Sequence, residues 1–448
     1  MAEIAPFRGL RYNLENVPSL AQLVIPPYDV ISKKEQQLFH QKNPYNMIRL
    51  ELGESTPEDS PADNPHTRAG SYLQEWLKKS ILIRDDQPAV YYYELEYSLS
   101  PQTRQTRYGF ICLLRLEDFS SGGVRPHERT FQAIKDERLR LMLACNANLS
   151  PVFALYSDPA QLVDHYLKSG READPLFHFR DDYAMKHTLW RVKNLKILQQ
   201  VRSLMHDKAI FIADGHHRYE TALNYRNIQR EQLKESGPRA IHEYIMVYLS
   251  NMNQGGLTIL PTHRVLKNIN SWDPRSFLRQ ALPFFQISEY KATEAGQMEW
   301  RSKLEEAKLK KETAVGFYSR KVDSFFLLKA KRDTVSTYLR QLEVPELLHE
   351  LDVVVLDKLI LRHLLGISEA LLGDENNIHF KHDFLDALLS VQSGDYEVGF
   401  FINPTRIEQV QEVATAGMIM PHKSTYFYPK VGSGLVVNPL YPNEEVFI

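Results

Sequence analysis

The 448-residue chain is 43% hydrophobic and 25% charged, which is the composition of an ordinary globular protein. Its 54 lysines and arginines nearly balance its 56 aspartates and glutamates, and the net charge of -2 argues against a protein that binds DNA or anionic membranes through overall charge. Its two cysteines exclude a disulfide scaffold and fit a reducing compartment.

The N-terminus has no basic start followed by an apolar stretch, and no apolar run approaches the ~18 residues that span a bilayer. We therefore expect a cytoplasmic protein. About 150 residues per domain suggests roughly three domains. The sequence predicts an N-terminal α/β region over residues 1–109, a core over 110–267 and a C-terminal α/β region over 268–448.

The first region opens with a predicted short strand over 23–25 and a helix whose N-cap is Ser32. Alternating apolar and polar residues over 46–52 predict a second strand. The amphipathic pattern of 69–79 predicts a helix. Between these two elements, residues 53–68 contain three prolines and few apolar groups, which predicts a polar surface loop.

Later segments alternate between the residue spacing of helices and that of strands. The sequence predicts a β-hairpin over 89–97 and 108–116, a helix over 130–146, buried strands over 151–156 and 208–213, a long helix after residue 218, and strands over 244–250 and 256–260. After residue 264, helices over 301–312 and 356–365 alternate with strands over 314–318 and 324–328. This alternation predicts a mixed α/β fold.

The sharpest motif is Asp-Gly-His-His-Arg, between a predicted strand and a predicted helix. A helix N-terminus exposes unpaired N–H groups and a partial positive charge, which together bind phosphate. Gly215 permits close backbone approach, and Arg218 can grip phosphate oxygens. His216 or His217 can donate a hydrogen bond or move a proton, and Asp214 can hold Mg²⁺ or accept a proton. The alternative is a plain helix cap with two partly exposed histidines.

A second polar segment, Arg125-Pro-His-Glu-Arg-Thr, precedes the helix predicted over 130–146. A His-Glu pair before a helix, here His127 with Glu128, can supply a general base together with a positioning group. The segment is not a zinc-protease signature, because position 131 is a phenylalanine. In the alternative interpretation, Thr130 caps the helix and Glu128 is a solvated carboxylate.

The third segment, residues 421–430, combines hydroxyls and aromatics with two lysines. Lys423, Ser424, Thr425 and Lys430 suit anion binding. We expect this segment to fold over the phosphate site as a lid. The alternative is an aromatic-rich loop that fills a domain interface.

Two further segments contain weaker candidates for site residues. Asp29 belongs to Pro-Pro-Tyr-Asp, and His263 and Arg264 follow an apolar strand. His263 and Arg264 could line the same cleft, and Asp29 is a further candidate. Alternatively, Asp29 caps a turn and the other two lie on the surface.

These segments resemble a family of prokaryotic proteins catalogued as a domain of unknown function, DUF1015. The matching segments are Pro26-Pro-Tyr-Asp-Val30, Arg125-x-His-Glu-x-Thr130, Asp214-Gly-His-His-Arg-Tyr219, Leu260-Pro-Thr-His-Arg264 and Pro421-x-Lys-Ser-Thr-Tyr-Phe-Tyr-Pro-Lys430. Residues 110–250 also resemble the ParB/sulfiredoxin fold. Within that fold they are most similar to the free-serine kinases, which carry Pro-His-Glu and Asp-Gly-His-His-Arg segments.

The resemblance implies a central ParB/sulfiredoxin-like domain that binds a nucleotide, with α/β extensions on both sides. It implies that Glu128 is the base, with His127 beside it, and that Asp214 assists it or holds Mg²⁺. It implies that Gly215, His216, His217 and Arg218 cradle the phosphates of ADP or ATP. The resemblance gives no mechanism for the third segment. From their own chemistry, we expect its residues Lys423, Ser424, Thr425 and Lys430 to bind the same phosphates. The residues that we expect to bind the substrate are Arg125, His263, Arg264 and Asp29.

We therefore expect Mg²⁺-dependent phosphoryl transfer from ADP or ATP to a small hydroxy amino acid, first of all L-serine. A nucleotide-binding regulatory protein and a small-molecule phosphohydrolase stay open as alternatives. We expect no DNA or membrane partner, and a homodimer is left open. Eighty-five residues separate Glu128 from Asp214, more than in the small kinases, and this insertion could alter the substrate. Position 216 is His where sulfiredoxin has Cys, which argues against reductase chemistry.

Overall fold

The computed structural model describes residues 2–100, 102–233, 237–269, 272–368, 371 and 377–447. Two compact units make up the chain. The first contains Met1–Pro126, Thr130–Leu257 and Pro429–Ile448, and the second contains His127–Arg129 and Thr258–Tyr428. Both units combine sheets with helices, which confirms the predicted mixed α/β class. The three-region division stays a prediction.

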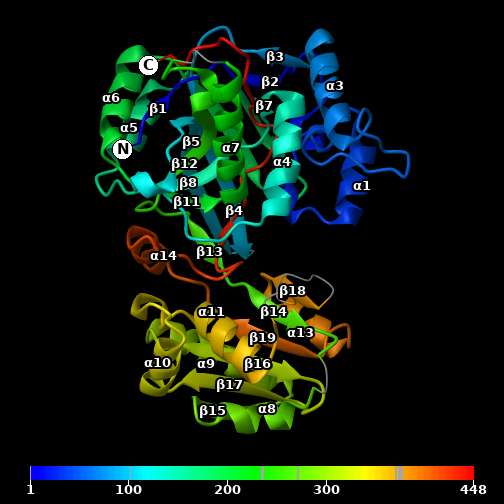
Figure 1. Cartoon of the computed structure of the whole chain (residues 1–448), viewed down its shortest axis with the longest axis vertical. Coiled ribbons are helices and arrows are strands. Elements are labelled where there is room, and N and C mark those ends of the chain that lie inside the picture. The colour runs from blue at the N-terminus through cyan, green and yellow to red at the C-terminus, as the bar shows by residue number, and fades with distance from the viewer. Residues whose placement is uncertain are drawn as a thin grey trace. The chain divides into compact units, whose positions relative to one another are not determined.

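A large mixed sheet forms the centre of the first unit (Figure 1). Its described strands run in the order β6-β11-β8-β12-β5-β4-β10-β9, and β1 pairs with β5. Their bounds are β1 (Ile4–Ala5), β4 (Val90–Ser100), β5 (Thr103–Arg115), β6 (Val124–Arg125), β8 (Val152–Tyr156), β9 (Phe177–Arg180), β10 (Lys186–Val192), β11 (Ile210–Asp214) and β12 (Tyr244–Asn251). The antiparallel pair β4–β5 is the predicted hairpin.

Helices surround this sheet, and α4 packs between α3 and α7 (Figure 1). Helix α5 packs against α6. The helix bounds are α1 (Lys33–Lys42), α2 (Ile48–Glu51), α3 (Pro65–Lys78), α4 (Gln132–Cys145), α5 (Leu162–Gly170), α6 (Leu195–His206) and α7 (His216–Gln232). The first unit also contains two separate two-stranded sheets. In one, β2 (Leu10–Tyr12) pairs with β3 (Leu82–Arg84), and in the other, β7 (Ala147–Asn148) pairs with β21 (Asn438–Pro439). The apolar side chains of the central strands form one continuous core with those of α5, α6 and α7.

Two local predictions were wrong. Residues 46–52 contain helix α2 rather than a strand, because their buried side chains are spaced for a helix: Met47, Ile48, Leu50 and Glu51. The strand predicted over 23–25 reduces to one bridge from Ile25 to Ser433. Ser32 does cap α1, with a reciprocal hydrogen bond from its backbone N–H to Glu35.

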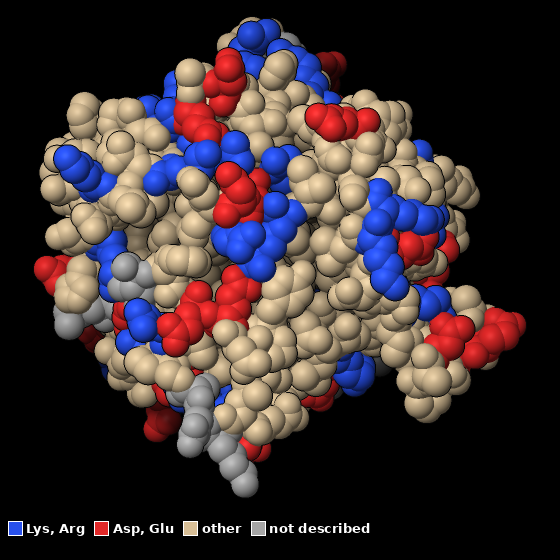
Figure 2. All heavy atoms as spheres, turned by 90° about the horizontal axis from the view of Figure 1, so that it is seen from above, with Lys and Arg blue, Asp and Glu red and all other residues tan. Residues whose placement is uncertain are grey.

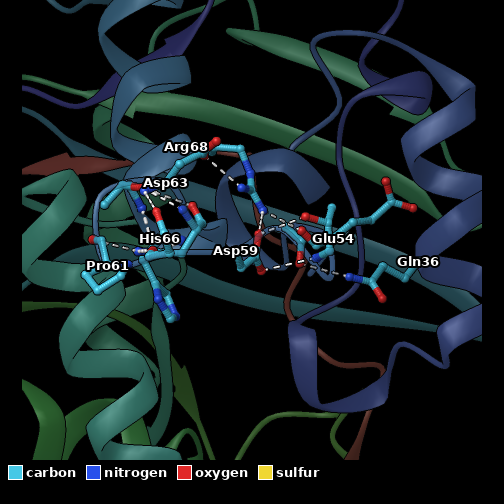
Figure 3. Close-up of polar contacts among 12 residues, drawn as sticks. Gln36, Glu54, Asp59, Pro61, Asp63, His66 and Arg68 are labelled. Atoms are coloured by element: carbon cyan, nitrogen blue, oxygen red, sulfur yellow. Dashed lines mark hydrogen bonds and ion pairs between the residues drawn. The ribbon is translucent and has the colours of Figure 1, made fainter.

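The predicted polar loop is organised around Arg68, the fourth residue of α3 (Figure 3). The Arg68 guanidinium donates to Asp59 Oδ1 and Asp63 Oδ1 at 2.8 Å each and to the Glu54 carbonyl at 2.9 Å. Asn64 caps the helix through two backbone N–H groups. Side-chain hydrogen bonds thus provide the contacts that a segment with few apolar groups lacks.

The second unit has its own sheet, in the order β15-β17-β16-β19-β14-β18. Its bounds are β14 (His263–Leu266), β15 (Phe285–Lys291), β16 (Ala314–Ser319), β17 (Ser324–Ala330), β18 (Ile378–Lys381) and β19 (Val398–Ile402), with a separate pair β13 (Thr258–Leu260) and β20 (Tyr426–Tyr428). The helices are α8 (Pro274–Ala281), α9 (Glu294–Leu309), α10 (Arg332–Gln341), α11 (Asp352–Val354), the π-helix η6 (Val355–Leu364), α13 (Phe384–Gln392) and α14 (Ile407–Thr415). Trp300 stacks on Phe325 at 4.8 Å in the core.

No helix in the described parts of the chain is both long and apolar enough to cross a bilayer. On the face drawn in Figure 2, acidic and basic side chains lie beside one another. This mixture agrees with the small net charge of the sequence.

Candidate functional site

The junction of β11 and α7 has the predicted strand–turn–helix geometry. All five residues of β11 are buried, and the strand ends at Asp214. Gly215 is the N-cap of α7 and has φ +90°, a left-handed conformation that disfavours a side chain. A Cβ at this position would lie 2.9 Å from Arg218 Nε. The turn therefore needs glycine both for its backbone and for the space that Arg218 occupies.

Asp214 is bound by a cation at each carboxylate oxygen. Arg218 Nη2 donates to Asp214 Oδ2 at 2.5 Å, and Lys430 Nζ donates to Oδ1. Arg218 Nη1 also donates to the Pro151 carbonyl at 2.5 Å, next to the start of β8. The three charged side chains are about one-tenth exposed, at 10%, 11% and 10% for Arg218, Asp214 and Lys430. Burial makes this triad a stronger electrostatic unit than the same pairs on the surface.

The Pro-Pro-Tyr-Asp segment lies beside this triad. Asp29 Oδ2 is 3.9 Å from Lys430 Nζ. The Arg138 guanidinium lies 4.1 Å from the centre of the Tyr28 ring. Burial raises the pKa of Tyr28 to about 12, and the charge of Asp29 adds to the rise. The contact between Asp29 and Lys430 joins two segments that are 401 residues apart in sequence.

Sequence reasoning missed Glu51 and Arg138. Glu51 is 2% exposed, 3.6 Å from Arg138, and accepts a 2.9 Å hydrogen bond from Ser150 Oγ. Burial raises the pKa of Glu51, while Arg138 and Arg218 oppose that rise. A buried carboxylate needs such partners. The only sequence signal for Glu51 was its place among apolar residues at helical spacing. Because residues 46–52 were predicted to be a strand, that spacing was not recognised.

Side chains in the first turns of α7 form hydrogen bonds with the start of α4. The backbone N–H of Phe131 donates to His217 Nε2 at 2.9 Å, and the two rings stack. An N–H can only donate, so Nε2 carries no proton in this arrangement. Glu220 accepts from Thr130 Oγ1 at 2.9 Å and from Lys135 Nζ at 2.8 Å. His217 and Glu220 therefore position the start of α4.

The start of α7 itself offers hydrogen-bond donors that suit an anion. The N–H groups of its first turn have no intrahelical acceptor, and His216, its first residue, is buried. Arg218 Nε hydrogen-bonds no residue that the structure describes. Chemically, this arrangement can exchange a carboxylate oxygen of Asp214 for a phosphate oxygen.

The same arrangement does not fit a resident metal ion. In the described ranges, no group of three or more His, Cys, Asp or Glu side chains is placed to hold one. Both oxygens of Asp214 are bound to cations. Asp214 as a Mg²⁺ ligand stays a prediction, and it requires one of these ion pairs to open.

Glu128 lies in the second unit, and the segment 421–425 holds it there. Its Oε1 accepts the backbone N–H groups of Ser424 at 3.1 Å and Thr425 at 3.3 Å. His127 Nε2 is 2.8 Å from Thr425 Oγ1, and the His127 carbonyl accepts the N–H of Met420. The Pro-His-Glu and Lys-Ser-Thr segments are therefore one structural element.

The segment at 262–264 is bound to the same element. Arg264 Nη2 donates to the Lys423 carbonyl at 3.0 Å, and Nη1 donates to Thr262. Burial lowers the pKa of Arg264 to about 10. His263 is 2% exposed, its Nδ1 accepts the Ile402 N–H at 3.3 Å, and burial lowers its pKa to about 3. His263 is thus a neutral core residue rather than a surface one.

The predicted site residues divide between the two units. The first unit contains Asp29, Arg125, Asp214, Gly215, His216, His217, Arg218 and Lys430, and the second contains His127, Glu128, His263, Arg264, Lys423, Ser424 and Thr425. Arg125 lies apart from the triad, with its guanidinium 5.5 Å from the centre of the Phe211 ring and its Nε donating to the Gly122 carbonyl. The predicted cleft shared by Glu128 and Arg218 joins both units and stays a prediction, as does the lid role of Lys423.

Comparisons with known proteins give one clear result. A search of curated proteins found no match. Among solved structures, a mutant free serine kinase in complex with ADP has a TM-score of 0.33 at 10% identity, covering 68% of this chain and 84% of that one. A conserved hypothetical protein from Pyrococcus furiosus has a TM-score of 0.30 at 13% identity, covering 72% and 91%. SbnI from Staphylococcus aureus, truncated at its C-terminus, has a TM-score of 0.33 at 8% identity, covering 74% and 87%.

TM-scores of this size carry no conclusion about activity. The comparison with family models, in contrast, identifies the family of this chain. The family described as "Protein of unknown function (DUF1015)" matches residues 4–354, which is more than half of the chain and includes four of the five segments that carry the resemblance. This chain therefore belongs to the DUF1015 family.

Proposed function

We propose that the protein binds the phosphates of ADP or ATP at the start of α7 and transfers a phosphoryl group to the hydroxyl of a small amino acid, with L-serine as the first candidate. The observation that carries the proposal is the Arg218–Asp214–Lys430 triad at a glycine-capped helix N-terminus. Phosphoryl transfer depends mainly on positioning and charge stabilisation rather than on covalent chemistry.

In this proposal Asp214 holds the place of the phosphate in the free protein. The carboxylate keeps Arg218 and Lys430 oriented toward one point, which reduces the cost of organising them when a phosphate arrives. The backbone N–H groups at the start of α7 then contribute further hydrogen bonds. Phosphate binding would release Asp214 from at least one cation, so that its carboxylate becomes available to the acceptor.

Glu128 is the proposed base for the acceptor hydroxyl, from its resemblance to the Pro-His-Glu segment of the free-serine kinases. Only Arg129 separates it in the chain from Thr130, whose hydroxyl is bonded to Glu220 of α7. The amide groups that hold Glu128 Oε1 would fix the orientation of the carboxylate. Mg²⁺ bound with the nucleotide would neutralise phosphate charge, and we assign it no step.

The test combines binding and turnover on the full chain. We expect ADP and ATP to bind by calorimetry, and Arg218→Ala to weaken that binding by about 2 kcal/mol, because it removes a charge-assisted contact to phosphate. Arg8→Ala in the same unit, remote in sequence from the motif, is the matched control. Mass spectrometry of reactions with L-serine and nucleotide would detect O-phosphoserine. Equal nucleotide affinity in Arg218→Ala and wild type would overturn the binding proposal.

A non-catalytic nucleotide-binding protein is the second candidate. The observation that favours it is the pair of backbone amides on Glu128 Oε1, an arrangement that a purely structural carboxylate would also make. The two candidates differ in outcome. Binding of ADP or ATP without phosphorylated product or released phosphate supports the second, and release of free phosphate alone supports a phosphohydrolase.

A further inference from the structure

A cavity in the first unit lies at the other end of β8 from the triad. It measures about 250 Å³ and is lined by residues of strand β5, of helix α5 with its N-cap, and of the segment after β12, among them Gln105, Tyr108, Gln161, Asp164, Lys168 and Gln254. Asp214 pairs with Phe153 near the start of β8, whereas α5 follows the end of that strand at Tyr156. At about 3.3 Å per strand residue, the two sites are separated by roughly 10 Å or more.

Asp164 is the unusual group in this wall. The residue is 5% exposed, and neither carboxylate oxygen accepts a hydrogen bond within 3.5 Å from any residue that the structure describes. Two buried hydroxyls near it, those of Tyr92 and Tyr156, also lack described partners. Burial raises the pKa of both phenols, and the charge of Asp164 adds to each rise. Buried polar atoms that lack protein partners are satisfied by water or by a ligand.

Lys168 supplies the opposite charge to the same cavity. Residues 164 and 168 are one turn apart on α5, so their side chains share a face of the helix. The two are not an ion pair, since no N–O distance between them falls within 4 Å, and Lys168 Nζ instead lies 3.9 Å from the centre of the Tyr108 ring. A carboxylate and an ammonium thus face one cavity without neutralising each other. Three amide side chains complete the wall.

We propose that this cavity binds a free amino acid as its zwitterion, with the ligand ammonium on Asp164 and the ligand carboxylate on Lys168. A purely cationic ligand would be repelled by the ammonium of Lys168, and a purely anionic ligand would be repelled by the carboxylate of Asp164. A zwitterion satisfies both and matches a cavity below the ~300 Å³ at which drug-sized ligand sites begin. The site is independent of the proposed nucleotide site, because it lies at the opposite end of β8.

The experiment uses the full-length chain and the twenty L-amino acids as probes. Thermal unfolding identifies the amino acid that raises the midpoint most, and calorimetry with that amino acid gives its affinity. We expect Asp164→Asn and Lys168→Met each to weaken binding ~10-fold or more, since each removes a charged contact. The N-acetyl and carboxamide derivatives of the same amino acid should lose affinity similarly. Asp207→Asn, a change at an exposed carboxylate of the same unit, is the control.

Three results would overturn the proposal: no amino acid shifts the midpoint, the variants bind as wild type does, or the derivatives bind as well as the parent. The first of these would leave water as the occupant. If Asp164→Asn does not fold, Lys168→Met alone decides the outcome. ADP affinity should be unchanged in both variants, and amino-acid affinity should be unchanged in Arg218→Ala. The two proposals can therefore fail separately.

Discussion

Lys430 and Asp214 form a buried ion pair across 216 residues of sequence. The pair links the last segment of the chain to the strand–helix junction of the first unit. Lys430 also lies 3.9 Å from Asp29, so one ammonium serves two carboxylates. Removing it would leave both carboxylates with reduced compensation.

We therefore expect Lys430→Met to destabilise the first unit by about 2 kcal/mol, because Asp214 keeps only Arg218 as a partner. Asp214→Asn combined with Lys430→Met should recover part of that loss, which a double-mutant cycle of thermal unfolding would measure. Lys193→Met, which breaks the more exposed pair with Glu172, is the control and should cost less than ~1 kcal/mol. Equal losses in the two single lysine variants would contradict the prediction.

A glycine requirement at position 215 gives a second prediction. Gly215→Ala should destabilise the chain by about 2 kcal/mol or more, since φ is +90° and the new Cβ would press on Arg218 Nε. Gly122→Ala is a matched control, because Gly122 also has positive φ, +73°, but has nothing within 4 Å of the added Cβ. Chemical unfolding would separate the two. A loss at 215 no larger than at 122 would mean that Arg218 moves freely aside.

The role of Glu128 is tested by an isosteric change. Glu128→Gln keeps an oxygen to accept the Ser424 and Thr425 amides but cannot take a proton. If Glu128 is the base, turnover should fall ~10²–10⁴-fold while nucleotide affinity stays the same. Glu220→Gln, which changes a carboxylate of the same charge on α7, serves as the comparison. Full turnover in Glu128→Gln would remove it from the mechanism.

Asp164 gives a pH-dependent prediction. Burial raises its pKa from 3.8 to about 6, an effect that Lys168 opposes. The folded state therefore holds this proton more tightly than the unfolded state, and the stability that the group contributes is complete below about pH 4 and lost as the pH rises through 6. Asp164→Asn should be more stable than wild type at pH 7.5 by up to about 3 kcal/mol, and the difference should vanish by pH 4. Thermal unfolding at several pH values measures this. A constant difference across the range would show that Asp164 does not change ionisation.

Local patterns in the sequence were enough to predict the elements that present the site. The largely apolar run over 208–213 predicted β11, and the glycine and polar residues after it predicted the turn into α7. The hairpin β4–β5 was predicted from two segments on either side of a polar turn. The first segment is rich in tyrosine and valine, and the second is apolar. In each case the decisive residues are neighbours in sequence, so periodicity and turn chemistry contain the information.

Partners that are distant in sequence could not be predicted in this way. Glu51 is buried because its carboxylate has an ion-pair partner in Arg138, 87 residues later, and a hydrogen-bond donor in Ser150, 99 residues later. Without them a glutamate in this position is typical of a solvent-facing strand residue, which is why the helix α2 was missed. Likewise, the sequence placed Lys430 in an anion site but did not indicate Asp214 as its partner.

The return of residues 429–448 to the first unit has a consequence for how the protein is made. A ribosome completes Asp214 and Arg218 long before it reaches Lys430, and the whole stretch 258–428 of the second unit is synthesised in between. At ~5–20 residues per second, that delay is roughly 10–40 s. Throughout that interval Asp214 has Arg218 as its cation but not Lys430. The Arg218–Asp214–Lys430 triad therefore reaches its final charge balance only after residues 258–428 of the second unit have been synthesised.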